Sequence, residues 1–314
     1  MAALSSPHSG FAVSRRDGAP LFYEAWGQAD VRHVPLLLLD GIGCDGYVWR
    51  YLRDAFPERR NLHGHYRGHG RSPVPDDFTH LSLADLADDN AAILDDANIE
   101  AAVLVGHSMG VQVALEFTRR HPARIRGLVL LCGAPSHPLR TFRGSSSLEK
   151  VLPTAQSVVS RFPSIVNRVS KWVLPTRLAY EIAARTEIRR DAVDISAFMP
   201  YLEGVAQIDS RLFISTLAAA AAHSADDMLA SITVPALIVA GGKDGFTPPA
   251  RSHEMAARIP GSVLLELPEG SHTAPIEEPD VVNAAITRLL TTIDARVGDG
   301  PAGRSAGPAG RSAG

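Results

Sequence analysis

The sequence predicts an α/β fold in which helices cover both faces of a mainly parallel sheet. Continuous apolar runs at 34–39 and 101–105 are typical of strands buried on both faces, and segments with helical spacing follow them. Strand-like runs return at 234–240 and 263–267, again with a helical segment between them. Alternating strands and helices of this kind build a parallel sheet with helices on both sides.

A β-hairpin is predicted at the start of the chain, where β-like runs at 11–14 and 21–26 flank the turn Asp17-Gly18. The elements that follow it are a strand at 34–39, a helix at 81–99, a strand at 101–105, a helix at 111–120 and a strand at 126–132. After the middle of the chain, a helix at 251–258 separates the last two strands and a helix at 281–295 ends the pattern.

The alternation is interrupted at 134–229, which contain no strand-like run between helices and are predicted to be mostly helical. We expect this insertion to form a cap above the carboxyl ends of the strands, where open α/β sheets bind ligands. Residues 1–133 and 230–297 then form the two parts of the core. Residues 298–314 repeat Pro-Ala-Gly-Arg-Ser-Ala-Gly, have little to bury, and are expected to be a disordered tail.

The charge and cysteine content indicate an ordinary cytoplasmic protein. The 31 Lys and Arg nearly balance the 34 Asp and Glu, so no field of one sign favours nucleic acid or an anionic membrane. Apolar runs such as 35–39 are too short to span a bilayer, and residues 1–10 lack a secretory signal. Cys44 and Cys132 alone do not suggest a disulfide framework. No feature predicts the oligomeric state.

The candidate nucleophile lies in Gly106-His107-Ser108-Met109-Gly110, which matches G-x-S-x-G between a predicted strand and a predicted helix. Such a turn holds the serine in a strained conformation, and the small flanking residues allow neighbouring elements to approach closely. The pattern predicts Ser108 as the nucleophile of a hydrolase.

A serine hydroxyl needs a base, and the base needs an acid that fixes its tautomer. His272 follows the last strand, whereas His253 and His223 lie in helical segments that suit surface roles. Asp244 follows the preceding strand, which gives the order nucleophile, acid, histidine. The alternative position for the acid, after the strand at 126–132, holds no carboxylate.

With these residues the chain resembles the α/β-hydrolase fold superfamily, in the group of small carboxylesterases, lipases and cofactor-free haloperoxidases. The resemblance extends over about 11–295 and includes the R-G-x-G-x-S stretch at 67–72. It also includes Glu277 and Pro279 after His272. It implies the α/β-hydrolase fold and a reaction without metal or other cofactor.

Two backbone donors are expected to stabilise an oxyanion. The N–H of Met109 follows the nucleophile at a helix start, and the resemblance implies the N–H of Ile42 as the second donor.

The chain departs from the family at two positions. Asp40 replaces the usual histidine of a His-Gly pair, and His65 stands where relatives carry an acidic residue. We expect Asp40 to turn away from the oxyanion and to bond loop N–H groups; the other interpretation is a change of substrate or chemistry. His63, His65 and His69 are interpreted as loop residues without a metal, and Cys44 as a packing residue rather than a second nucleophile.

The sequence therefore predicts a serine hydrolase that cleaves a carboxylic ester or related acyl bond of a small apolar substrate through an acyl-enzyme. Carbon–carbon bond hydrolysis and perhydrolysis use the same three side chains and stay open. A ligand receptor that turns over slowly is the alternative from another class.

Overall fold

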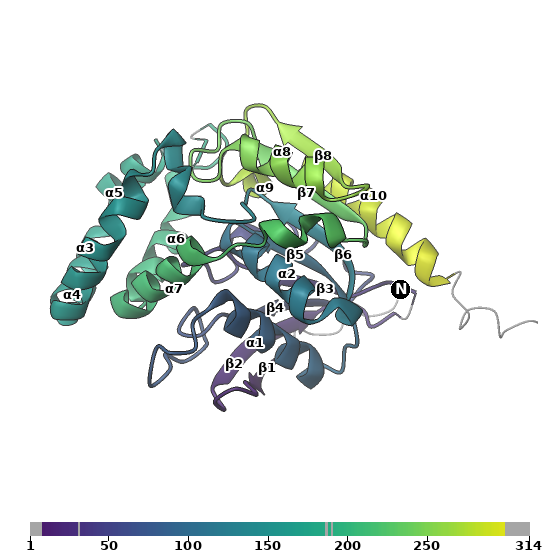
Figure 1. Cartoon of the computed structure of the whole chain (residues 1–314), viewed down its shortest axis with the longest axis horizontal. Coiled ribbons are helices and arrows are strands. Elements are labelled where there is room, and N and C mark those ends of the chain that lie inside the picture. Colours follow the sequence, from purple (N-terminus) through teal and green to yellow (C-terminus); the bar gives the residue numbers. More distant parts are fainter. Residues whose placement is uncertain (1–7, 31, 186–187, 190, 299–314) are drawn as a thin grey trace, which may run out of the picture.

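The computed structural model describes residues 8–30, 32–185, 188–189 and 191–298. Within them an eight-stranded sheet has the order β1-β2-β4-β3-β5-β6-β7-β8 (Figure 1). The strands are β1 His8–Val13, β2 Pro20–Trp26, β3 Leu36–Leu39, β4 Asn61–Gly64, β5 Ala102–His107, β6 Ile125–Leu131, β7 Ala236–Gly241 and β8 Val263–Leu267. Strands β4, β3 and β5 to β8 are parallel, and β2 joins them antiparallel to β4. The predicted mainly parallel sheet is confirmed.

The predicted hairpin is confirmed, because β1 and β2 pair antiparallel with Phe11 opposite Phe22. Gly18 has a positive φ of 76°, which suits glycine in a tight turn, and the Asp17 carboxylate accepts the N–H of Ala19 at 3.1 Å.

Strand β4 was not predicted. It is four residues long and carries Asn61 and His63, so it lacks the continuous apolar run of a buried strand. Its polar side chains are nevertheless buried and bonded: the Asn61 amide donates to the carbonyls of Phe56 and Arg59 at 3.0 and 2.9 Å. A four-residue strand in which two residues are polar leaves little trace in hydrophobic periodicity.

The principal helices lie on both faces of the sheet and in a separate group. They are α1 Leu83–Asp96, α2 Met109–Arg120, α3 Ser147–Arg161, α4 Pro163–Val173, α5 Arg177–Ala183, α6 Ile195–Gln207, α7 Ser210–Ala222, α8 Pro249–Arg258, α9 Ala274–Glu277 and α10 Pro279–Gly298. Leu37 and Leu39 of β3 pack in one core cluster with residues of α1, α2 and α8. Leu36 and Leu38 point to the opposite face and pack in a cluster with residues of α10. This alternation explains why the strand is apolar throughout.

Helices α3 to α7 lie together beside the sheet (Figure 1). Helices α6 and α7 are next to the sheet, and α3, α4 and α5 pack against them from outside. The assignment of 134–229 as a separate cap stays a prediction. Of the predicted tail at 298–314, Gly298 is instead the last residue of α10, and 299–314 lie outside the described residues. None of the helices that the structure describes is long and apolar enough to cross a membrane.

We predict that Gly110→Ala lowers the free energy of unfolding by about 3 kcal/mol, because a methyl group there would collide with the backbone carbonyl of Leu39 where α2 crosses β3. Gly204→Ala in α6 is the control, since its methyl group would lie 3.5 Å from the Asp45 carboxylate, an ordinary contact. Urea unfolding measures both variants. Equal midpoints would show that the close approach of α2 and β3 is not required.

Candidate active site

Ser108 lies at the bend between β5, which ends at His107, and α2, which begins at Met109. Its φ of 56° and ψ of −118° are rare for a residue with a side chain and store strain of about 1–3 kcal/mol. The flanking glycines permit the bend, because a side chain on Gly106 would overlap the backbone of Gly110. The bend presents the serine hydroxyl to solvent beyond the end of the strand.

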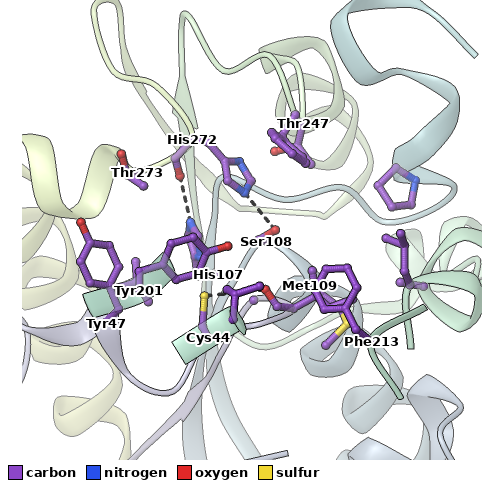
Figure 2. Close-up of a pocket in the computed structure, with 18 of the residues that line it drawn as sticks. Cys44, Tyr47, His107, Ser108, Met109, Tyr201, Phe213, Thr247, His272 and Thr273 are labelled. Atoms are coloured by element: carbon purple, nitrogen blue, oxygen red, sulfur yellow. Dashed lines mark hydrogen bonds between the residues drawn. The ribbon is translucent and has the colours of Figure 1, made fainter. Parts of the chain in front are cut away.

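The structure brings the three predicted side chains into one hydrogen-bonded chain. The Ser108 hydroxyl lies 3.0 Å from Nε2 of His272, and Nδ1 of His272 lies 2.9 Å from Oδ2 of Asp244. Figure 2 shows the His272 ring directed at Ser108. An ionised carboxylate only accepts, so Nδ1 carries the proton and Nε2 is free to accept from the serine.

Asp244 is held in place by the turn that follows β7. Its Oδ1 accepts the N–H groups of Phe246 and Thr247 at 2.7 and 2.9 Å, and Oδ2 accepts the Thr247 hydroxyl at 2.8 Å. Burial opposes ionisation of Asp244, but the His272 ring and the Thr247 hydrogen bonds outweigh it and lower the pKa of the carboxyl. The acid therefore stays charged beside the imidazole.

The loop that carries His272 is fixed by Glu277. The buried Glu277 carboxylate accepts the N–H and the hydroxyl of Ser271 and the hydroxyl of Thr273, with the first and last bonds at 2.8 Å. Both neighbours of His272 are thus tied to one side chain, which gives a physical reason for a glutamate at this spacing after the histidine.

His107 supports the same loop from the other side. Its Nε2 donates to the backbone carbonyl of His272 at 2.9 Å, and burial lowers the pKa of His107 to about 4. The ring is therefore neutral at neutral pH and adds no positive charge next to His272. Sequence reasoning did not single out this residue, because it occupies a variable position of the G-x-S-x-G motif.

Ile42 and Met109 both line the cavity beside Ser108. Met109 is the first residue of α2, so its N–H has no acceptor within the helix. For the part of the chain that the structure describes, no acceptor is recorded for the backbone N–H of either residue. Two backbone donors are thus left at the position expected for an oxyanion site.

A cavity of about 360 Å³ opens in front of Ser108. Its wall is mainly aliphatic and aromatic, with Phe198, Tyr201 and Phe213 contributed by α6 and α7. Tyr47 lies beside Tyr201 at a ring distance of 5.5 Å (Figure 2). None of the described residues that line it is Asp, Glu, Lys or Arg. The arrangement suits an uncharged substrate with an apolar group.

The profile of the α/β hydrolase fold family matches residues 34–279, most of the chain. The chain belongs to this family. Its relatives include proteins named "Putative carbamate hydrolase RutD": that of Variovorax paradoxus is 29% identical over 88% of this chain and 98% of the relative, and that of Caulobacter vibrioides is 27% identical over 86% and 95%.

Solved structures of the same fold include an esterase from Thermogutta terrifontis and an enol-lactonase from Burkholderia xenovorans. The esterase has a TM-score of 0.72 at 24% identity and covers 91% of this chain and 99% of its own. The enol-lactonase has a TM-score of 0.73 at 23% identity and covers 90% and 100%. These likenesses confirm the predicted α/β-hydrolase fold.

In this hydrolase the R-G-x-G-x-S stretch is a structural anchor. The buried Arg67 guanidinium donates to both carboxylate oxygens of Asp89 at 2.5 and 2.8 Å, and to the Ser14 hydroxyl at 2.7 Å. The Ser72 hydroxyl donates to the carbonyl of His65 at 2.8 Å and accepts the N–H of Phe22 at 2.9 Å. The stretch joins α1, the hairpin and β2.

We expected the Asp40 side chain to bond loop N–H groups, and this prediction was wrong. Asp40 is fully buried and is not part of the cavity wall, and its Oδ2 bonds Nε2 of His63 at 2.7 Å rather than loop N–H groups. Strand β4, which the sequence did not reveal, carries His63 to this position. Burial opposes the charge on Asp40, but the His63 ring outweighs it and lowers the pKa of Asp40.

At position 65, where the resemblance implies an acidic residue, the His65 ring acts as a hydrogen-bond acceptor. Burial and the adjacent His63 lower the pKa of His65 to about 4, so the ring is neutral and its Nδ1 accepts the N–H of Arg71 at 2.9 Å. The rings of His63 and His65 lie 4.8 Å apart. The two departures from the family pattern are therefore neighbours: an acid replaces a histidine at 40, and a histidine replaces an acid at 65.

The other singled-out residues have structural partners. His69 Nδ1 bonds the carbonyl of Arg67 at 2.9 Å, and His253 pairs with Glu266 at the surface. His223 is not a surface residue, since its side chain is mostly buried between Glu116 and Gln112. Both cysteines are buried and form no disulfide within the described residues, and Sγ of Cys44 lies 3.9 Å from the carbonyl of Ile42.

We predict that the residues at positions 40 and 65 are energetically coupled. Asp40→His removes the acid that pairs with His63, and His65→Asp places a second carboxylate in the same buried site. The double variant restores one acid and one histidine. We expect its loss of unfolding free energy to be smaller than the sum of the single losses by at least about 1 kcal/mol.

Urea unfolding of the four proteins measures this coupling. Pairing Asp40→His with the remote Val281→Ser supplies an additive control, because Val281 lies on the exposed surface of α10. Additive losses for Asp40 and His65 as well would show that the two positions are not energetically coupled.

Proposed function

We propose that the chain hydrolyses a carboxylic ester, or a related acyl bond, with Ser108 as nucleophile. The observation that carries this proposal is the hydrogen-bonded chain from Asp244 through His272 to Ser108. Since a serine hydroxyl attacks only when a base accepts its proton, an imidazole at 3.0 Å with its other nitrogen on a carboxylate supplies what the reaction needs.

The reaction takes place in two stages. The Ser108 oxygen attacks the acyl carbon while Nε2 of His272 takes the serine proton, and the N–H groups of Ile42 and Met109 receive the negative charge on the carbonyl oxygen. His272 then protonates the departing alcohol, which leaves an acyl-serine. A water molecule then gives one proton to His272 and attacks the same carbon. The bond from that carbon to the serine oxygen breaks as His272 returns the proton to this oxygen, which releases the acid and the free serine.

The cavity supports an apolar, uncharged acyl or alcohol group. Burial of aliphatic surface against residues such as Leu202 and Leu217 favours binding by roughly 25 cal/mol for each Å² removed from water. An ionised substrate would meet no cationic side chain in the described wall. Carbon–carbon bond hydrolysis and perhydrolysis through the same side chains stay open, and a cytoplasmic location stays a prediction.

Carbamate hydrolysis is the second candidate, because relatives that match nearly the whole chain carry that name. The same attack by Ser108 applies to a carbamate carbonyl. The apolar wall favours a neutral carbamate ester over a small carbamate anion.

We predict that Ser108→Ala reduces hydrolysis of p-nitrophenyl butyrate by at least about 10⁴-fold and abolishes labelling by a fluorophosphonate, because it removes the hydroxyl that bonds Nε2 of His272. Asp244→Asn should lower the rates of labelling and of turnover alike by about 10³–10⁴-fold, because the wrong tautomer of His272 cannot accept the serine proton. Cys44→Ala, at another cavity residue, is the matched control. Wild-type turnover by Ser108→Ala would refute the nucleophile.

We predict that kcat/KM rises from acetyl to butyryl or hexanoyl p-nitrophenyl esters, since each buried methylene contributes about 0.8 kcal/mol. A neutral aryl carbamate should react by the same serine, whereas an ionised carbamate should not. Steady-state kinetics on these substrates distinguishes the two candidate functions. A preference for the anion would contradict the assignment from the cavity wall.

A further inference from the structure

The outer surface of α3, α4 and α5 carries most of the large apolar side chains that the described chain exposes. Ten of the sixteen such residues lie there: Leu148, Val151, Val158, Phe162, Ile165, Val169, Trp172, Val173, Leu178 and Ile182. Single exposed apolar residues are common on folded proteins. A group of this size is typical of a surface that contacts another protein or a membrane.

The spacing in α4 places its exposed apolar residues on one side of the helix. Ile165, Val169, Trp172 and Val173 follow the intervals i, i+4, i+7 and i+8. Trp172 is 80% exposed, which is unusual for an indole in a folded protein. The opposite side of α4 faces α6 and α7, so this outward stripe contributes nothing to the core.

A second stripe is formed by Leu148, Val151 and Val158 of α3 and by Phe162 directly after that helix, at the intervals i, i+3, i+10 and i+14. Helices α3 and α4 are neighbours, and α5 lies at the same edge of the molecule in Figure 1. We call these outward surfaces of α3, α4 and α5 the outer cap face.

The outer cap face is cationic although the whole chain is not. Residues 147–185 contain six basic and two acidic residues, a formal charge of +4, against −3 for the chain. Both acids already have a basic partner: Glu149 pairs with Arg140 at 2.8 Å, and Glu181 with Arg177 at 4.0 Å. The excess of basic over acidic residues in this segment is not apparent from the near-neutral charge of the whole chain.

Arg168 and Lys171 stand beside the apolar stripe of α4, and the described part of the chain supplies no carboxylate within ion-pair distance of either. An exposed helix with an apolar stripe, a tryptophan and bordering cations has the composition of a helix that lies in a membrane interface. We propose that the outer cap face docks on the anionic surface of a lipid bilayer.

The charge also argues against a second copy as the occupant. A symmetric dimer through this face would place two segments with an excess of basic residues opposite each other, which opposes association. Anionic headgroups would instead neutralise Arg168 and Lys171 while the apolar stripe enters the acyl boundary. Leu148 belongs both to the outer cap face and to the cavity wall, so docking would orient the cavity toward a source of apolar esters.

The test uses the full chain with vesicles of phosphatidylcholine containing 30% phosphatidylglycerol, and with pure phosphatidylcholine, at about 50 mM salt. Trp172 reports on docking, because Trp49 is fully buried and the Trp26 indole is bonded to the Arg53 carbonyl at 2.8 Å. We expect a blue shift of emission and co-sedimentation with the anionic vesicles, both reversed by about 0.5 M salt.

Arg168→Glu combined with Lys171→Glu should weaken binding at least about tenfold, because each cation contributes about fivefold. Trp172→Ala should abolish the emission shift and reduce co-sedimentation. Val263→Ser, at an exposed valine of β8, is the control and should bind like the parent. Circular dichroism checks that every variant is folded.

Failure of the wild type to bind anionic vesicles would overturn the proposal, as would charge-reversed variants that bind equally well. A concentration-dependent dimer in sedimentation velocity that is lost in Trp172→Ala would assign the face to a second copy instead. Since these measurements need no turnover, Ser108→Ala should bind vesicles like the parent, and failure of the proposed hydrolysis would leave the result unaffected.

Discussion

The rest of the site depends on one strained backbone conformation. Ser108 adopts a positive φ at the bend between β5 and α2, and a chain free to relax would not hold it there. Close packing enforces it: Gly110 meets the backbone of Leu39, and Gly133 meets Val111, at distances that only glycine permits. The buried sheet and α2 thus supply the energy that keeps the hydroxyl exposed.

The parallel sheet then brings the partners of Ser108 together. Asp244 follows β7 and His272 follows β8, so both loops emerge at the edge of the sheet where β5 ends. Each side chain is held by its own hydrogen bonds. The Thr247 hydroxyl and two backbone N–H groups bond Asp244, and the Glu277 carboxylate bonds the loop around His272. Such supports let residues more than 100 positions apart meet within hydrogen-bond distance.

Local patterns predicted most strands and helices and the order of the three candidate residues. Hydrophobic periodicity and turn chemistry depend on residues that are neighbours in the sequence, so they can be identified without the fold. They did not predict β4, whose four residues include Asn61 and His63. The partner of Asp40 was missed for the same reason, since His63 reaches it only through the pairing of β4 with β3. Contacts across the sheet leave no sign in the local sequence.

Asp40 and His65, the two departures from the expected pattern, are linked through one buried ring, that of His63. Several carboxylates surround this ring, since Asp40 bonds it and the charges of Asp45 and Glu24 act on the same cluster of imidazoles. Moving the acid from one side of His63 to the other preserves a charged partner for that ring, while the neutral His65 keeps the acceptor that Arg71 requires. Because burial makes an unpaired charge costly, Asp40 and His63 depend on each other, and a substitution at position 65 acts on the same ring.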